Sequence, residues 1–238
     1  MKTRPLLCEL HAHTTWSDGV LTVAELVDLY GRNGFDVLAI TDHVVREDDP
    51  WAPLGTGRRY IHEANHADYL DELAHEAARA RDCYDLLVLP GLELSCNAVD
   101  PRAAGHALAV GLREFIGVDE GLAPALESAA AHGAALIAAH PSEPDNLDLR
   151  RTGLFASNVG ARELVHRFEL FNRNELFDWV ARERLPAVAT GDFHRLEHLA
   201  TWKTLLPCPK QEEAVVTYLR SAAPAFLAPL APVLAAAA

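Results

Sequence analysis

The chain has 238 residues, half of them hydrophobic, and a formal net charge of −13 at pH 7. A chain of this length buries one sizeable core, so we expect a single domain over residues 1–238. The acidic excess disfavours a surface for long duplex nucleic acid, and it would repel an anionic substrate unless bound cations supplied positive charge.

Cellular location is indicated only by what the sequence lacks. The four cysteines contain no C-x-x-C pair, which favours reduced thiols over a disulfide framework or a zinc knuckle. No apolar run approaches the roughly 20 residues that span a bilayer, and the start of the chain has no signal-peptide pattern. We therefore expect a cytoplasmic protein with no membrane partner.

Short apolar runs alternate with longer segments of helical spacing. The runs are typical of strands covered on both faces, and they lie at Leu6–His11, Asp36–Thr41, Leu86–Leu94, His106–Gly111, Ala134–His140, Arg167–Phe171 and Pro186–Gly191. The helical segments lie at Thr22–Gly34, His62–Cys83, Asp119–His132 and Asn174–Glu183. This alternation predicts βαβ units whose parallel strands form a closed or nearly closed barrel. The stretch 222–238 is interpreted as an edge strand followed by a frayed tail rich in Ala and Pro.

Polar side chains recur where these runs end. Nine of them stand out: His11, His13, Asp18, His43, Glu93, His106, His140, Asp192 and His194. Residues two apart in a strand point to the same side, so His11 and His13 can face one ion, and Asp192 and His194 repeat that spacing. The C-terminal rim of a βα barrel is where active sites are assembled, which predicts a metal centre there. His106 is an exception because it begins its run.

The residue types suit a particular group of metals. Imidazole and carboxylate together favour Zn²⁺, Mn²⁺ or Fe²⁺, and nine ligands suit two or three divalent ions. Glu93 and Asp192 are the natural bridging ligands, because a carboxylate has two oxygens. Three divalent ions, three ligand carboxylates and one hydroxide leave a charge of +2, which would match a phosphate monoester dianion. Water activated by the ions, with its pKa lowered to about 7, would then attack phosphorus.

Seven short stretches of the sequence are similar to motifs of one protein family. They are Leu10-His11-Ala12-His13-Thr14, Ser17-Asp18-Gly19, Ile40-Thr41-Asp42-His43, Gly91-Leu92-Glu93-Leu94-Ser95, Gly105-His106, Ala139-His140-Pro141 and Gly191-Asp192-Phe193-His194, with Trp202-Lys203-Thr204 similar to a family tail. In this order they resemble the PHP (polymerase and histidinol phosphatase) superfamily, especially its small stand-alone metal-dependent phosphoesterases. The resemblance implies an α/β fold, a distorted (βα)7 TIM-like barrel with a trinuclear site, and phosphoester hydrolysis.

The resemblance also implies how the nine ligands are shared. One ion would be held by His11, His13, Glu93 and Asp192. A second would be held by Glu93, His106 and His140. A third would be held by Asp18, His43 and His194. Some relatives have His in place of Asp18, so filling of the third position is left open.

Other polar residues near these motifs have less specific interpretations. Asp42 lies between Thr41 and His43 and is expected to support the ligands without binding an ion. His62 and His66 are four residues apart on a predicted helix and could bind a metal, but a solvated helix face is favoured over this reading.

Substrate contacts are predicted on the loops. The segment Val44–Tyr60 follows His43 and carries Trp51, Arg58 and Arg59, which are expected to bind a phosphate and a ring or base. An equally weighted alternative is that the two arginines pair with acidic residues of the same loop. Arg195 and Lys203 are also predicted to reach the rim. Arg150 and Arg151 form a weaker candidate pair on the segment after His140.

The leading hypothesis is metal-dependent hydrolysis of a phosphoester in a small phosphorylated metabolite, nucleotide or short oligonucleotide. A catalytically silent PHP-like metal-binding module that serves a partner protein is the alternative. An amidohydrolase-like barrel also opens with H-x-H, but it predicts a carboxylated lysine at a middle strand end. No lysine lies between Lys2 and Lys203, which weighs against that reading. The sequence leaves the substrate, the general acid and the oligomeric state open.

Overall fold

The computed structural model describes residues 4–49, 60–143 and 152–230. All seven predicted strands are present within a residue or two of their expected bounds. They are β1 (Leu6–Glu9), β2 (Val37–Ile40), β4 (Leu87–Cys96), β5 (Gly105–Val110), β6 (Ala135–Ala139), β7 (Arg167–Asn172) and β9 (Ala187–Thr190). Their residues are almost all buried, as expected for strands covered on both faces.

Four further strands lie outside the predicted runs. They are β3 (His43–Val45), β8 (Glu175–Leu176), β10 (Trp202–Leu206) and β11 (Phe226–Pro229). The strand order is β11-β10-β1-β2-β4-β5-β6-β7-β8, with β3 on β4 and β9 on β7. β11 is therefore an edge strand within the 222–238 stretch, whereas residues 231–238 lie outside the described residues.

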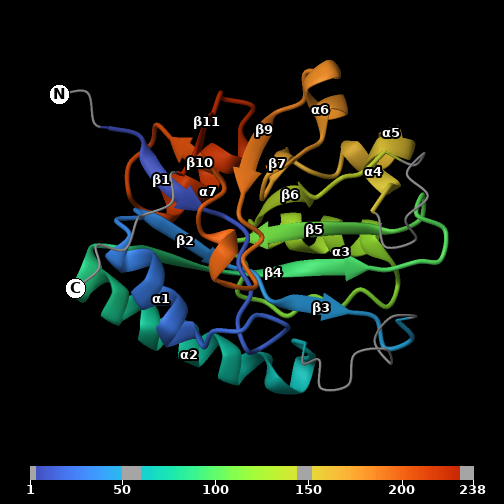
Figure 1. The fold of residues 1–238 in the computed structure, drawn as a ribbon. Helices are drawn as coiled ribbons and strands as arrows, with labels where there is room; N and C mark the ends of the chain where they lie inside the picture. The colour runs from blue at the N-terminus through green and yellow to red at the C-terminus, as the bar shows by residue number, and fades with distance from the viewer. Residues whose placement is uncertain (1–3, 50–59, 144–151, 231–238) are drawn as a thin grey trace.

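The prediction that all seven strands run parallel is wrong for β5. This strand pairs antiparallel with both β4 and β6, and Figure 1 shows its arrow opposed to that of β4. The physical reason is the short connection: only residues 97–104 separate β4 from β5, whereas a parallel crossover needs about a dozen residues or more. The N-terminal end of β5 therefore lies beside the C-terminal ends of its neighbours.

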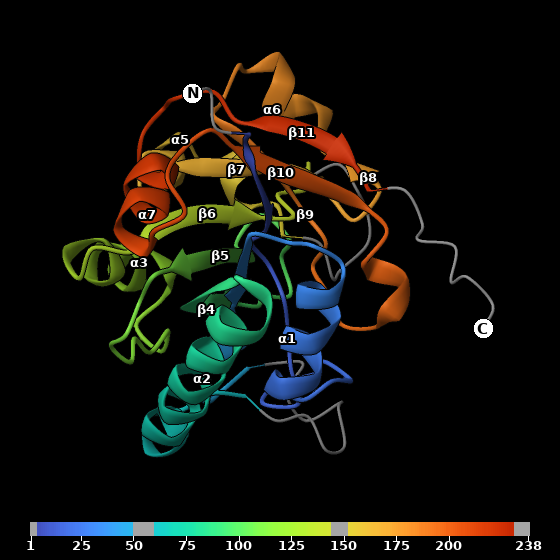
Figure 2. The same cartoon turned by 90° about the vertical axis from the view of Figure 1, so that its left-hand side faces the viewer.

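Helices surround the sheet (Figures 1 and 2), and all but the last of them pack on its outer side. They are α1 (Val23–Arg32), α2 (Glu63–Tyr84), α3 (Leu122–Ala131), α4 (Leu154–Ser157), α5 (Val159–Arg162), α6 (Asp178–Arg182) and α7 (Glu212–Arg220), with a 3₁₀ turn η2 at Leu196–His198. Thr22 and Glu25 form the predicted capping box of α1. The helix predicted over Asn174–Glu183 is correct only in its second half, because β8 folds back on β7 in the first half.

The core has two parts, one on each face of the curled sheet. Alternate residues of the strands, such as Leu38 and Ile40, pack outward against the helices, and Val37 and Ala39 pack inward. Val215 and Leu219 of α7 join the inward group. The guanidinium of Arg167, at the start of β7, donates to main-chain carbonyls of and just after α7. Helix α7 therefore lies against the end of the sheet at which β7 begins.

The sheet curls until the segments that follow β1 and β9 meet. Just beyond these strands, Ala12 and Phe193 form a parallel bridge, with His13 N donating to Phe193 O over 2.8 Å. Within the strands, the Thr204 hydroxyl of β10 accepts a hydrogen bond from Ala189 N of β9 and donates one to Ala189 O. The mixed α/β architecture and the curled sheet agree with a distorted barrel, whereas the count of seven βα units stays a prediction. None of the described helices has the length and apolar character of a membrane span.

Candidate metal centre

The two motifs His11-Ala12-His13 and Asp192-Phe193-His194 lie at least 179 residues apart in sequence and are joined by the Ala12–Phe193 bridge. Ala12 and Phe193 are fully buried in the hydrophobic core. The residues on either side of them face one another: His11 Nε2 and His13 Nε2 each lie 3.5 Å from Asp192 Oδ1, and His194 Nδ1 lies 3.2 Å from the same oxygen. The bridge thus brings His11, His13, Asp192 and His194 together, and it explains why the spacing of two recurs in both motifs.

The first group of facing atoms lies at the buried end of the cluster. His11 Nε2 and His13 Nε2 are 3.0 Å apart, and each lies 3.2 Å from Glu93 Oε2. Each also lies 3.5 Å from Asp192 Oδ1. The side chains of His11, His13 and Glu93 have no exposed surface. Four ligand atoms from three distant parts of the chain therefore converge on one point.

The other oxygen of Glu93 faces a second group. Glu93 Oε1 lies 2.9 Å from His106 Nδ1 and 3.2 Å from His140 Nε2. His106 belongs here because β5 is antiparallel, which places it opposite Ser95 on one side and Ala139 on the other. The reversed strand thus accounts for the one ligand that begins its run instead of ending it. Glu93 is placed between the two groups, as a bridging carboxylate would be.

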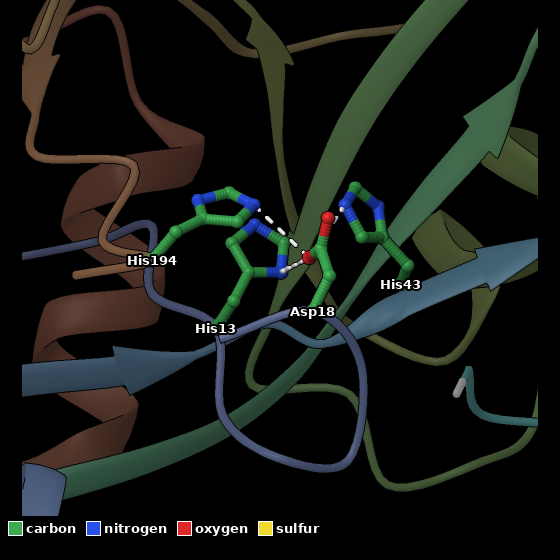
Figure 3. A group of neighbouring side chains, drawn as sticks. All are labelled: His13, Asp18, His43 and His194. Atoms are coloured by element: carbon green, nitrogen blue, oxygen red, sulfur yellow. Dashed lines mark ion pairs between the residues drawn. The ribbon is translucent and has the colours of Figure 1, made fainter. Parts of the chain in front are cut away.

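The third group lies at the rim and is drawn in Figure 3. Asp18 Oδ1 lies 3.0 Å from His194 Nε2, 3.5 Å from His43 Nε2 and 4.0 Å from His13 Nδ1. Asp18 comes from the loop after β1, and His43 begins β3 beside Glu93. His43 also contacts the first group, since its Nδ1 lies 3.0 Å from Glu93 Oε2, the oxygen that faces His11 and His13.

These separations fit shared metal ions. Ligand atoms bound at about 2.1 Å lie about 3.0 Å apart at a right-angled corner and about 3.4 Å apart at a tetrahedral one. Three sets of side chains have ligand atoms within 4.8 Å of one another: His13, Asp18, His43 and His194; His11, His13 and Glu93; and His43, Glu93 and His106. Ring nitrogens and carboxylate oxygens that face each other need protons or cations between them. All nine predicted ligands lie in this cluster, and their metal roles stay predictions.

The electrostatics of the cluster couple its acids to its bases. Burial by itself would raise the pKa of the Glu93 carboxyl, but the facing His43 and His11 rings bring it well below its usual range. Burial likewise opposes ionisation of Asp18, and its contacts with His194 and His43 lower its pKa. For His194, burial lowers the pKa, yet Asp18 and Asp192 raise it to about 10. At His106 burial prevails over Glu93, and the pKa is lowered.

Glu169 was missed by the sequence reasoning. This buried β7 carboxylate lies 2.8 Å from His11 Nδ1, and its other oxygen accepts from His140 N over 2.6 Å. The Thr190 hydroxyl and the Asn172 amide hold it in place. A carboxylate behind a ligating imidazole fixes the tautomer and makes the ring a better ligand. Glu169 lies in the middle of the apolar run predicted as β7, so the rule of polar residues at strand ends did not select it.

Hydroxyl groups support other ligands. Ser17 Oγ lies 3.2 Å from His13 Nδ1 and donates to Asp42 Oδ1, which also accepts from Thr14 N over 2.8 Å. Asp42 thus has the supporting position expected for it. Thr152 Oγ1 lies 3.1 Å from His140 Nδ1. These contacts orient the rings without adding charge beside them.

A buried ion pair fixes the backbone of both motifs. Glu9 Oε1 accepts from His11 N over 3.2 Å and from Gly191 N over 2.8 Å, while Glu9 Oε2 lies 3.0 Å from Lys203 Nζ. A Cβ on Gly191 would lie 2.3 Å from Glu9 Oε2 and 2.5 Å from Lys203 Nζ. Lys203 has no exposed side-chain surface, so this position does not favour the substrate contact predicted for it. It instead supports the Asp192 motif.

Arg173 is a second residue that the sequence reasoning missed. Its Nη2 donates to Asp192 Oδ2 over 2.9 Å and to the Asp192 carbonyl over 3.2 Å. It also lies 3.3 Å from His194 Nδ1. Arg173 and Asp192 both have positive φ, at 55° and 43°, which a non-glycine residue adopts only where its surroundings hold it. Arg173 engages Oδ2 and leaves Oδ1 to face the histidines, so Asp192 is arranged for one metal contact, unlike Glu93.

The remaining predicted substrate contacts lie apart from the cluster or outside the described residues. Arg195 follows His194, but its side chain is 65% exposed and lies 3.8 Å from Glu197. Trp51, Arg58 and Arg59 fall outside the described residues, as do Arg150 and Arg151. His62 caps α2 and is exposed, in agreement with the solvated reading, whereas His66 is buried among aromatic rings.

Comparisons with known proteins find solved structures with a similar fold. No protein-family model and no curated protein matches this sequence. A two-domain protein of Bacteroides vulgatus, described as "containing predicted PHP-like metal-dependent phosphoesterase", matches over 94% of this chain at 18% identity with a TM-score of 0.66. This chain spans 64% of that protein. A protein of Chromobacterium violaceum, described as an amidohydrolase with bound sulfate and no metal, matches over 79% of this chain and 87% of its own length, at 18% identity and a TM-score of 0.51.

The chain thus has the fold of proteins described as PHP-like metal-dependent phosphoesterases, and the resemblance inferred from its motifs is confirmed at that level. At this sequence identity the likeness concerns the fold alone.

Proposed function

We propose that this chain is a metal-dependent phosphoesterase that hydrolyses a small phosphorylated metabolite, nucleotide or short oligonucleotide. One observation carries the proposal. His11 Nε2, His13 Nε2, Glu93 Oε2 and Asp192 Oδ1 face one another at 3.0–3.5 Å in a largely buried place. Such an arrangement of bases and acids is stabilised by a cation at its centre.

We propose two to three bound ions, of Mn, Zn or Fe, shared as the three groups of facing atoms suggest. Glu93 supports this because its two oxygens face different groups of histidines. Bound ions of this kind supply Lewis acidity and a water nucleophile that is active near neutral pH. The chain itself contributes rigid placement, since its ligands are fixed by the Ala12–Phe193 bridge and the Glu9–Lys203 pair.

Anion binding at an acidic protein needs local positive charge. The chain has a net charge of −13, and three of the nine ligands are carboxylates. Two or three divalent ions would reverse the charge of the cluster, and Arg173 adds a guanidinium in contact with Asp192. A phosphate group is the substrate chemistry that matches such a centre. The contacts predicted for Trp51, Arg58, Arg59 and Arg195 stay predictions.

The amidohydrolase alternative is not favoured by the site. Each of the nine ligand positions is His, Asp or Glu, and no lysine lies between Lys2 and Lys203 to form a carboxylated bridging ligand. Glu93 lies where a bridge between the first two groups is needed. The name of the Chromobacterium violaceum protein therefore does not change the proposal.

The test is metal content by elemental analysis, on the same sample assayed against a panel of phosphate esters with Mn²⁺ and with Zn²⁺. We expect two to three ions per chain and release of phosphate. Full loading with no phosphate release from any ester would overturn the phosphoesterase and favour the silent metal-binding module. Less than one ion per chain after reconstitution would overturn the metal centre itself.

A further inference from the structure

The imidazole ring of His106 is turned the opposite way from the rings of three other histidine ligands. His11, His13 and His140 direct Nε2 to the carboxylates and Nδ1 to a supporting residue. His106 directs Nδ1 to Glu93 Oε1 over 2.9 Å and Nε2 away, to Asn97 Oδ1 over 3.0 Å. Its orientation therefore depends on a different supporting residue.

Asn97 has one fixed orientation because of Asp49. The Asn97 Nδ2 group donates to Asp49 Oδ2 over 2.8 Å, and Asp49 is 3% exposed. An ionised carboxylate only accepts hydrogen bonds, so the amide nitrogen must face Asp49 and the amide oxygen must face His106. The amide oxygen is also an acceptor, so the ring nitrogen that faces it, His106 Nε2, must carry the proton. The hydrogen bonds from Asp49 through Asn97 to His106 therefore determine which ring nitrogen of His106 carries the proton.

We propose that Asn97 is a positioning residue that holds His106 as its Nε2–H tautomer, so that Nδ1 is the atom it presents to a metal ion. Asp49 acts through Asn97 by setting the direction of the amide. With the proton on Nε2, His106 Nδ1 and Glu93 Oε1 are two acceptors 2.9 Å apart, and a cation between them makes that contact favourable. This inference rests on the metal centre of the proposed function and on no particular substrate.

The test is ¹⁵N NMR of protein labelled at histidine nitrogens, without metal and after addition of Zn²⁺ alone. In the metal-free protein we expect the His106 signals of the Nε2–H tautomer. On addition of Zn²⁺, the Nδ1 signal should shift as that of a metal-bound nitrogen. A His106 ring with the proton on Nδ1, or with Zn²⁺ on Nε2, would overturn the proposal. The metal-free spectrum is independent of any hydrolysis, so a failure of the phosphoesterase proposal is distinguishable from a failure of this one.

Variants separate Asn97 from the fold around it. Asn97→Leu should allow both tautomers of His106 and weaken binding of one Zn²⁺ ion by about 10–100-fold, the usual effect of losing a partner behind a ligand. Asn97→Asp combined with Asp49→Asn exchanges the two groups, so one amide donor still lies between them and an acceptor oxygen still faces His106. This double variant should retain the Nε2–H tautomer, and it remains informative if the leucine variant fails to fold. Asp48→Asn is the matched control, because Asp48 is 83% exposed and pairs with Arg46. An Asn97→Leu protein with the wild-type tautomer and Zn²⁺ affinity would contradict the assignment.

Discussion

The two ends of the metal cluster are built differently. At the inner end, His11, His13 and Glu93 have no exposed side-chain surface; Glu93 lies in β4, and the two histidines lie just after β1, on either side of the bridged Ala12. At the rim, the side chains of Asp18, His43 and His194 are 17–20% exposed. Asp18 and His194 also lie on connecting segments rather than in strands. Fully buried ligands are pre-arranged for a resident ion, whereas partly exposed ligands lose more conformational freedom when they bind one.

The residue that supports His11 is charged, whereas the residues that support the rim histidines are neutral. His11 lies against the Glu169 carboxylate, which is itself held by Thr190 and Asn172. His43 Nδ1 faces the Ser95 hydroxyl at 2.9 Å, and His194 Nδ1 faces the Asp192 carbonyl at 3.0 Å. An imidazole ring that is hydrogen-bonded to a charged carboxylate is a stronger metal ligand than a ring that is hydrogen-bonded to a neutral group. We therefore expect a tightly bound ion at the inner end and an exchangeable one at the rim.

Removing an inner ligand should have the largest effect. We expect His11→Ala to lose the resident ion and to reduce phosphoester hydrolysis by at least about 100-fold, more than the usual loss of a supporting partner. The measurement is metal content by elemental analysis together with the rate of phosphate release. His75→Ala is the control, because the His75 side chain is 80% exposed and lies on the outer helix α2. Retention of full metal content by His11→Ala would contradict the distinction between the two ends.

Weakening the support behind His11 should come next. Glu169→Gln keeps the shape of the side chain but removes its charge, and we expect metal affinity at the inner end to fall by about 10–100-fold. Competition with a chromophoric chelator measures this affinity. Glu197→Gln removes an exposed carboxylate near the rim and should leave it unchanged. Equal losses in the two variants would point to net charge as the cause and would exclude a specific role of Glu169.

Removing a rim ligand should have a smaller effect. We expect Asp18→Asn to weaken binding of one exchangeable ion by about tenfold, in the lower part of the range for perturbed metal sites, while the inner ions stay bound. Stepwise titration of metal-free protein with Mn²⁺ resolves the two classes of site. If the tight class is lost and the weak class remains, the assignment of the two ends is wrong.

Much of this arrangement could be predicted from the sequence. The near-continuous apolar runs placed seven strands, and the recurrence of polar residues near their ends predicted the nine side chains that the structure brings together. The rule worked because buried strands leave few positions for a polar residue other than the rim.

Other features depend on contacts that no local pattern records. The direction of β5 follows from a short connection and from pairing on both sides, so the place of His106 could not be explained in advance. Glu169 meets His11 across 158 residues of sequence. Lys203 was predicted to reach the rim because the sequence does not show that its side chain is buried. Its buried partner Glu9 lay within a run that was interpreted as apolar.

The pH dependence should give the finest distinction between binding and folding. Burial lowers the pKa of His194, but Asp18 and Asp192 raise it to about 10, so the ring carries a proton at pH 7 in metal-free protein. An imidazole must be neutral to bind an ion, so binding at the rim releases this proton. Affinity should then rise by up to about tenfold per pH unit between pH 7 and 9.

Stability of the metal-free protein should change in the opposite direction. A histidine whose pKa is raised on folding contributes stability that is complete below its unfolded value of about 6.5, and this contribution is lost as pH rises through the folded value of about 10. Chelator competition at several pH values and thermal unfolding of metal-free protein measure the two trends. His194→Gln removes the titrating ring, so the pH dependence of metal affinity and the pH dependence of stability should each become smaller by one proton. If affinity were independent of pH while metal-free stability still fell above pH 8, His194 would titrate in the fold without binding an ion, and the rim would not be a metal site.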